Sequence, residues 1–368
     1  MATYKSIKYI IPVEAVEHTD SINALSDVDT VTKAPNDYQI LVWSAADSKW
    51  YPRNVAETVG TQKAIFGFGE GSGLTNITNL VSILGVVATD TTGVGTVRNV
   101  LAAAGYGGDK AIFGFGYSFA NYTSNYYNIT NLVSNLGVVA TDTTGVGSNR
   151  GYLASAKFGG DKALFGFGYA TTNPGYTQNY YNITNLVSNT GVVASDSTGV
   201  GSGRGYLASA GYGVDKAIFG FGNEQGSGYN SDITNITNLV SNLGIVATNT
   251  TGVGMARGSL AAAGYGEDKA IFGFGNTTNA NVTNVTNLVS NTGIVATDTT
   301  GVGTARLHLA ASSYGGDKAL FGFGVYTSGY NQNYQNITNL VSNTGIVATD
   351  TTGVGTARSG LAAAGFAT

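Results

Sequence analysis

The chain has 368 residues, a formal net charge of −4 at pH 7 and no cysteine. The weak acidic charge gives no electrostatic basis for gripping nucleic acid, and the missing thiols exclude disulfides and thiolate metal sites. Glycine is frequent, proline is scarce, and β-branched and aromatic residues dominate the apolar set. This composition favours an all-β protein of many short strands joined by glycine turns.

Residues 1–58 differ in kind from the rest and form the first predicted domain. Tyr4–Ile11 alternates as a single strand does. The apolar stretch Ile10–Val13 is too short for a signal peptide, and no run is long enough to cross a membrane. We therefore expect neither a cleaved signal nor membrane insertion.

A β-hairpin is predicted near the end of this domain. Residues 38–44 and 48–51 face each other across Ala45–Asp47, and the pair carries both tryptophans, Trp43 and Trp50. A segment this small has little core and usually needs a partner surface or oligomerisation. We interpret it as an anchor or assembly segment, and a homo-oligomer stays open.

Residues 59–368 form the second predicted domain, built from six copies of one repeat at a spacing of roughly fifty residues. The clearest copy of its central motif is Asp109–Gly116, Asp-Lys-Ala-Ile-Phe-Gly-Phe-Gly. The other copies are Gln62–Gly69, Asp161–Gly168, Asp215–Gly222, Asp268–Gly275 and Asp317–Gly324. This period is typical of propellers and arrays.

Each repeat predicts four short strands: a Leu-Ala-rich run, the central motif, Ile-Thr-Asn-Leu-Val and Gly-Val-Val-Ala-Thr. The two-residue period of the central motif places Ala64, Phe66 and Phe68 on one face and Ile65, Gly67 and Gly69 on the other. Phenylalanines of one sheet then fill the gaps left by glycines of the next. The small residues of the Leu-Ala run suit the innermost strand of a propeller blade.

The ends of the array favour a ring over an open stack. The first copy has no Leu-Ala run before Gln62, and the last copy ends after the run Leu361–Phe366. Joining the two completes a six-bladed β-propeller of four-stranded blades, closed by the C-terminal strand. Closure removes the exposed edges that an open array has to cap, and no polar caps are visible.

The repeat resembles that of kelch β-propellers over residues 62–368. The resemblance is carried by Thr304-Ala-Arg306, the Leu-Ala run and Asp317–Gly324, although the adjacent glycine pair is here Gly-Phe-Gly and the tryptophan of the fourth strand is absent. It implies a propeller in which the recurring arginine bonds backbone carbonyls between blades. The arginines are Arg98, Arg150, Arg204, Arg257, Arg306 and Arg358.

A second resemblance lies in the N-terminal domain. Leu25–Thr30, Asn36–Trp43 and Lys49–Pro52 are similar to a segment common in tail-fibre and other virion proteins of tailed bacteriophages. The resemblance implies a virion component made in the host cytoplasm, with other virion proteins as partners of the N-terminal segment.

The copies differ from one another in two places. One is the segment between the second and third strands: Glu70–Asn76, Tyr117–Asn128, Tyr169–Asn182, Asn223–Asn235, Asn276–Asn284 and Val325–Asn336. The other is the pair after each arginine: Asn99-Val100, Gly151-Tyr152, Gly205-Tyr206, Gly258-Ser259, Leu307-His308 and Ser359-Gly360. Because strand direction alternates, both should emerge on one face of the ring.

The variable segments are rich in tyrosine, asparagine, serine and glycine, a composition that paratopes also use. The candidate receptor-binding residues are Tyr122, Tyr126, Tyr127, Tyr176, Tyr180, Tyr181, Tyr229, Tyr330 and Tyr334. We expect this face to bind a glycan or protein of the host surface. The alternatives are drifting loops without a ligand, and a structural decoration or connector of the virion.

The recurring charged residues have structural interpretations. Asp109-Lys110 and its counterparts indicate hairpin turns. The aspartates of Thr/Ser-Asp-Thr/Ser-Thr-Gly each stand alone without the clustered oxygens that Ca²⁺ needs. These are Asp90, Asp142, Asp196, Asp298 and Asp350, with Asn249 in the remaining copy. A ring of arginines capturing anions is the alternative to the structural role of the arginines.

Catalytic sets are missing from the repeats. His18 and His308 are the only histidines, and no Ser/His/Asp set, zinc ligand set or close carboxylate pair is present. We therefore predict no enzyme, no metal and no cofactor, and an enzyme that cleaves surface polysaccharide stays as a third hypothesis.

Overall fold

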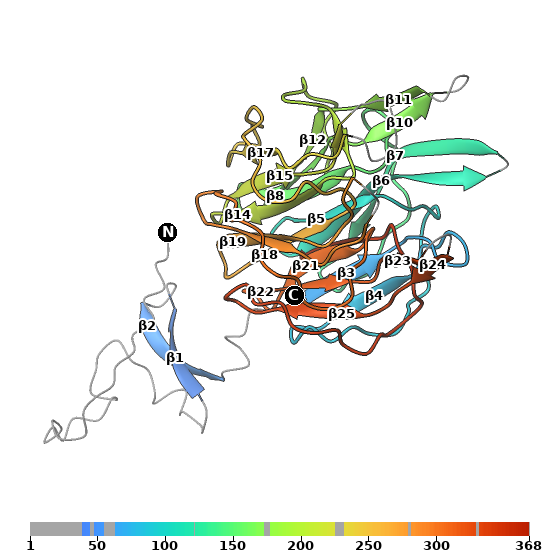
Figure 1. The fold of residues 1–368 in the computed structure, drawn as a ribbon. Helices are drawn as coiled ribbons and strands as arrows, with labels where there is room; N and C mark the ends of the chain where they lie inside the picture. The colour runs from blue at the N-terminus through green and yellow to red at the C-terminus, as the bar shows by residue number, and fades with distance from the viewer. Residues whose placement is uncertain are drawn as a thin grey trace, which may run out of the picture. The chain divides into compact units, whose positions relative to one another are not determined.

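The computed structural model describes residues 39–44, 48–54, 63–120, 122–172, 177–224, 232–278, 281–328 and 331–367. The chain divides into two compact units, Met1–Val59 and Gly60–Thr368 (Figure 1). The described residues form strands, bridges and turns, which confirms the all-β class. No helix among them is long and apolar enough to cross a membrane.

The first unit contains the predicted hairpin. Strand β1 (Gln39–Ser44) pairs antiparallel with β2 (Lys49–Asn54), and the register places Trp43 opposite Trp50. The strand predicted over Tyr4–Ile11 lies outside the described residues.

The described part of the second unit contains six three-stranded antiparallel sheets, numbered here by repeat. Sheet 1 joins β26 (Ala362–Phe366), β3 (Lys63–Gly67) and β4 (Thr78–Val81), and sheet 2 joins β5 (Ala102–Tyr106), β6 (Lys110–Ala120) and β7 (Thr123–Val133). Sheet 3 joins β8 (Ala154–Phe158), β9 (Lys162–Gly166) and β12 (Thr184–Val187), and sheet 4 joins β14 (Ala208–Tyr212), β15 (Lys216–Gly220) and β17 (Thr237–Val240). Sheet 5 joins β18 (Ala261–Tyr265), β19 (Lys269–Gly273) and β20 (Thr286–Val289), and sheet 6 joins β21 (Ala310–Tyr314), β22 (Lys318–Gly322) and β25 (Thr338–Val341).

The predicted fourth strand is not continuous, so that part of the prediction is wrong. In repeat 1 it meets β4 only through the bridges Val81↔Val87 and Thr78↔Thr91. The four residue steps from Val87 to Thr91 lie opposite the three steps from Thr78 to Val81, and this extra residue is a β-bulge. The bulge turns the Ala88 carbonyl and the Asp90 carboxylate toward the amide nitrogen of Asn79, at 3.0 and 2.8 Å.

Neighbouring sheets interlock through phenylalanine and glycine, as predicted. A Cβ atom on Gly67 would lie 2.8 Å from the Cζ atom of Phe113, the central phenylalanine of sheet 2. The same contact recurs between successive sheets and returns from sheet 6 to sheet 1, where Phe66 lies against Gly322. Each glycine is therefore a socket for one ring.

The predicted orientation of Phe68 is wrong. Phe68 has a φ of 64°, and this left-handed conformation ends the alternation of β3. Phe68 consequently packs on the side of Ile65, with its ring 5.2 Å from that of Phe113. Phe66 packs on the opposite side, against Phe323.

The small-residue strands follow one another around the unit. β5 contacts β8, and the succession continues through β14, β18, β21 and β26 back to β5. β26 pairs with β3, with Ala362 opposite Gly67, so the predicted pairing of the C-terminal run with the first copy is confirmed.

A closed ring of six backbone hydrogen bonds lies beside these strands. Its members, which we call ring positions, are the second residues after the arginines: Val100, Tyr152, Tyr206, Ser259, His308 and Gly360. The N–H of each donates to the carbonyl of the one before it over 2.6–2.9 Å, and Val100 donates to Gly360. All six have φ between 48° and 61°.

Candidate binding surface

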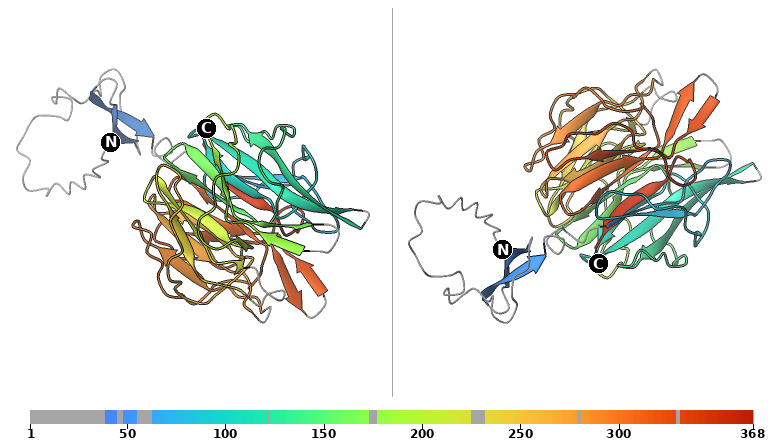
Figure 2. Two further views of the ribbon diagram at one scale, coloured as in Figure 1. Left: turned by 90° about the horizontal axis from the view of Figure 1, so that it is seen from above. Right: turned by 90° about the horizontal axis from the view of Figure 1, so that it is seen from below.

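The two variable regions of each repeat are joined by β-bridges, so they lie on one side of the unit, as predicted. The residue after each arginine bridges to the start of a variable segment, as Asn99 does to Tyr117 and Gly151 to Tyr169. We call this side the variable face. The hairpins β6–β7, β10–β11 (Tyr169–Thr172 and Thr177–Tyr180) and β23–β24 (Val325–Ser328 and Asn331–Tyr334) all project from it (Figure 2).

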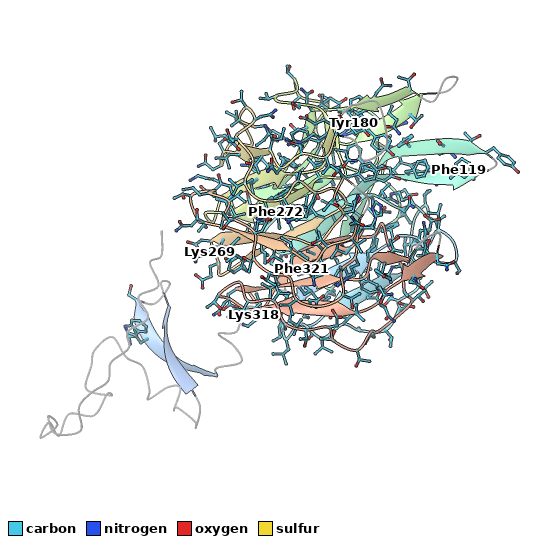
Figure 3. All side chains as sticks on the ribbon, in the orientation of Figure 1. Phe119, Tyr180, Lys269, Phe272, Lys318 and Phe321 are labelled. Atoms are coloured by element: carbon cyan, nitrogen blue, oxygen red, sulfur yellow. The ribbon has the colours of Figure 1, made fainter. Side chains whose placement is uncertain are left out.

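The opposite face carries the turns between the first and second strands. Tyr106 pairs with Lys110 across a three-residue turn in which Gly107 and Gly108 have positive φ, so the turn interpretation of Asp109-Lys110 is confirmed. Lys269 and Lys318 of equivalent turns lie away from Phe119 and Tyr180 (Figure 3).

Six of the described tyrosines on the variable face form one connected group, the tyrosine cluster. Its members are Tyr117, Tyr126, Tyr152, Tyr169, Tyr180 and Tyr206. The ring of Tyr169 stacks on Tyr152 with centroids 4.7 Å apart and on Tyr180 at 5.1 Å. Tyr126 links this group to Tyr117, with centroids 5.0 Å apart. The cluster therefore spans the second and third repeats and reaches Tyr206.

Two buried members hold the others in place. Tyr169 and Tyr206 are 5% and 8% exposed, and their hydroxyl oxygens lie 3.0 Å apart. Burial raises the pKa of Tyr169 far above its ordinary value, so the phenol stays neutral. The hydroxyl of Tyr126 lies 3.1 Å from that of Thr171 and so joins two hairpins. The half-buried Tyr126, Tyr152 and Tyr180 are thus preorganised.

The structure places the predicted tyrosines differently from one another. Tyr126 and Tyr180 belong to the cluster, and Tyr122 is 93% exposed at the β6–β7 turn. Tyr127 lies 2.9 Å from Ser118 by their hydroxyl groups, and Tyr334 donates to Gln332 in the sixth repeat. Tyr181 is half-buried, and its N–H bonds the carbonyl of Gly168. Tyr176, Tyr229 and Tyr330 lie outside the described residues.

The prediction missed four members of the cluster. Tyr117 and Tyr169 each begin a variable segment, and Tyr152 and Tyr206 each stand second after an arginine. Their variability between repeats was the available signal. Their convergence depends on bridges between segments that are distant in the sequence.

The recurring arginines are all fully buried, and each donates a hydrogen bond to an asparagine side chain. Arg98 is 0% exposed, and it donates to the carbonyl of Phe115 at 2.6 Å and to the Asn131 side chain at 2.7 Å. Its guanidinium carbon lies 4.4 Å from the ring centre of Phe68 in the neighbouring sheet. The expected bonding of carbonyls between blades is therefore wrong for Arg98: its side-chain hydrogen bonds run within its own repeat, and its cation–π contact joins two sheets. Burial lowers the pKa of Arg98 to about 10, so it stays charged at neutral pH.

The aspartates in the bulged segments also make hydrogen bonds within the repeat structure. Asp142 accepts from the hydroxyl of Thr96 at 2.6 Å and from the amide of Asn131 at 2.8 Å. Burial raises the pKa of Asp142, but these hydrogen bonds and Arg98 outweigh it and leave the pKa below its ordinary value. Asn249 makes the equivalent bond to Asn238 at 2.9 Å. An amide side chain therefore replaces the carboxylate in this contact of the fourth repeat.

A comparison with models of protein families found no match, and neither did a comparison with curated proteins. Within the described ranges, no group of three or more histidines and acids is placed to hold a metal ion. The chemistry that the variable face offers is stacking on tyrosine rings and hydrogen bonding to hydroxyl and amide groups.

Proposed function

We propose that residues 60–368 form a six-bladed, kelch-like β-propeller, and that the chain is a phage virion protein of the tail-fibre or surface-fibre type. Its variable face binds a host-surface receptor, a glycan or a protein. The N-terminal unit attaches the chain to other virion proteins.

Three observations support the propeller. The sheets follow one another with the small strands in succession, the hydrogen-bond ring has one member from each repeat, and the Phe-into-Gly contact returns from the last sheet to the first. A ring of packed sheets satisfies all three and leaves only short edges.

The proposal of receptor binding rests on the distribution of tyrosine. The six repeats share one backbone arrangement, but the tyrosines of the cluster come mainly from two of them. The positions equivalent to Tyr117 and Tyr169 hold Glu70, Asn223, Asn276 and Val325 in the other repeats. If the tyrosines served folding, each repeat would need them, yet four repeats keep the same backbone without them. Half-buried aromatic rings on a firm base suit stacking on sugar or protein surfaces.

The virion assignment rests on the resemblance of residues 25–52 to virion proteins, and it sets the ligand as a surface component of bacteria. The proposal involves no catalytic step and no cofactor.

The test measures binding of the labelled full chain to a panel of intact Gram-negative and Gram-positive bacteria. The variant Y126S/Y152S/Y180S removes the half-buried members of the tyrosine cluster. The control L84S/L136S/L243S removes three leucines, about 70% exposed, from the turns after the third strands on the opposite face. We expect saturable binding of parent and control to at least one strain, and loss of binding in the tyrosine variant with its melting curve preserved.

Equal binding of parent and tyrosine variant would contradict the proposal. Absence of saturable binding to every strain, with the chain folded, would favour a structural decoration or connector of the virion.

A further inference from the structure

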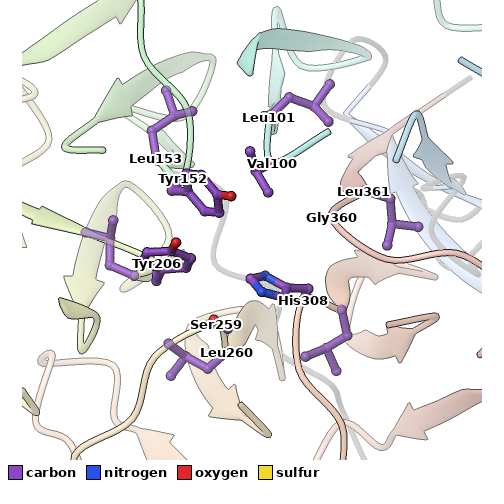
Figure 4. Close-up of a pocket in the computed structure, with 12 residues that line it drawn as sticks. Val100, Leu101, Tyr152, Leu153, Tyr206, Ser259, Leu260, His308, Gly360 and Leu361 are labelled. Atoms are coloured by element: carbon purple, nitrogen blue, oxygen red, sulfur yellow. The ribbon is translucent and has the colours of Figure 1, made fainter. Parts of the chain in front are cut away.

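A small pocket lies at the centre of the hydrogen-bond ring, and we call it the axial pocket (Figure 4). Its volume is about 80 Å³. It is lined by the six ring positions and, next to each, a leucine: Leu101, Leu153, Leu207, Leu260, Leu309 and Leu361. Since ligand pockets are usually several times larger, this one accommodates only one end of a ligand.

The wall of the axial pocket is aromatic on one side. The ring centroids of Tyr152 and Tyr206 are 4.2 Å apart, and His308 lies 6.3 and 5.9 Å from them. The three side chains turn toward a common centre (Figure 4). Ser259 and Gly360 complete the circle with small side chains, so the open space lies beside the aromatic wall.

The polar groups of the pocket suit an uncharged ligand with hydroxyl groups. None of the described lining residues is Asp, Glu, Lys or Arg. The backbone N–H groups of the ring positions are used within the ring. No described residue hydrogen-bonds the His308 imidazole, whose neutral form offers one donor and one acceptor.

We propose that the axial pocket holds the terminal ring of a neutral glycan, with the sugar against Tyr152 and its hydroxyl groups bonded to His308. This assignment rests on the proposed function, because it names the part of a receptor that the variable face takes. The rest of the glycan then runs outward over the half-buried tyrosines Tyr126 and Tyr180. An acidic terminal sugar finds no cationic partner in the lining and is disfavoured.

Ring position 360 provides a variant that fills the pocket. A tyrosine at residue 360 would adopt the left-handed φ that the other five ring positions already take, which is a strained conformation for a residue with a Cβ atom. It would also require a small shift of Asn99, whose Cβ atom would lie 3.2 Å from the new Cβ atom. We expect G360Y to fold like the parent and to block the site. A second variant, H308F, keeps the ring and removes both hydrogen-bonding nitrogens.

The experiment titrates the full chain with methyl glycosides of glucose, galactose and N-acetylglucosamine, and with N-acetylneuraminic and glucuronic acids. Binding is followed by saturation-transfer NMR. We expect one neutral glycoside to bind, the dissociation constant to rise at least tenfold in H308F, and binding to be abolished in G360Y. The control L136S, on the opposite face, should bind as the parent does.

Preferred binding of an acidic sugar, or unchanged sugar binding in G360Y, would overturn the assignment. The assignment would also be overturned if the parent chain bound none of the sugars and G360Y attached to bacterial cells as well as the parent does. That result would leave the proposed function intact. If the parent chain bound neither the sugars nor any bacterial cells, both proposals would be overturned.

Discussion

Each repeat contains an arginine and, two residues later, a ring position. The arginine is the same in all six repeats, whereas the ring position differs between them. Arg98 and its five counterparts are identical and fully buried, whereas the ring positions that follow them hold Val, Tyr, Tyr, Ser, His and Gly. Both are fixed by hydrogen bonds. At the arginine the side chain makes the bonds, and at the ring position the backbone makes them. Because the ring constrains only the main chain, its side chains are free to vary.

The backbone conformation of the ring positions carries an energetic cost. Val100 and Tyr152 adopt a left-handed conformation that costs a non-glycine residue about 1 kcal/mol or more. The surrounding structure must supply this energy in the five repeats whose ring position is not glycine. We therefore expect stability to depend on the frame and binding to depend on the variable face, and the following predictions test that division.

Removal of residues 357–368 should have the largest effect. The deletion takes away β26, which pairs with β3, and Arg358, which bonds Phe68 and Asn79. We expect the cooperative unfolding transition to disappear in circular dichroism melts. A truncated chain that still melts cooperatively near the parent temperature would show that the frame does not need closure.

Replacement of Arg98 by methionine should be the largest effect of a single substitution. The change leaves the Phe115 carbonyl and the Asn131 side chain without their buried donor, and breaking such a buried pair costs about 3–5 kcal/mol. Urea unfolding measures the loss. The matched change K110M removes an exposed ion pair with Asp109 and should leave the unfolding free energy nearly unchanged.

Substitution of Gly67 by alanine should destabilise the interlocked sheets. The new Cβ atom would meet Phe113 at 2.8 Å, and overpacking of this kind costs about 1–3 kcal/mol. Gly73 is the control, because a Cβ atom at that residue would have no neighbouring atom within 4 Å, and G73A should leave the unfolding free energy nearly unchanged. Equal effects of the two substitutions would contradict the packing of the Phe113 ring into the space at Gly67.

Acid should lower the free energy of unfolding through His308, an exception to the division between frame and variable face. Burial lowers the pKa of His308 to about 4 from its ordinary 6.5, so the unfolded state takes up a proton first as the pH falls. The contribution is complete above pH 6.5 and is lost progressively toward pH 4. Between pH 7 and 5 we expect the free energy of unfolding to fall by at most about 2 kcal/mol. The variant H308Q should lack this part of the pH dependence, and an unchanged profile would contradict it.

Much of the frame is predictable from the sequence because it repeats. The period, the hairpin turns such as Gly107–Asp109, the pairing of β26 with β3 and the glycine sockets all follow from the spacing of residue types. The orientation of Phe68 does not, since a two-residue period carries no information on the sign of φ. The bulge before Asp90 likewise depends on a side-chain bond to Asn79.

The candidate site is less predictable. Tyr126 and Tyr180 were found from composition alone, but Tyr152 and Tyr169 join them through contacts between different repeats. The ring positions are visible in the sequence only as variable residues. Their convergence on one pocket requires the backbone hydrogen-bond ring, which no side chain encodes.

Amide hydrogen exchange at the six ring positions tests the central claim most directly. If the backbone ring holds each position whatever its side chain, the N–H groups of Gly360 and Val100 should exchange as slowly as that of Tyr152, and Y152S should leave all six protected. Fast exchange confined to Val100 and Gly360, or loss of protection around the ring in Y152S, would contradict a frame that is closed and independent of the residues it displays.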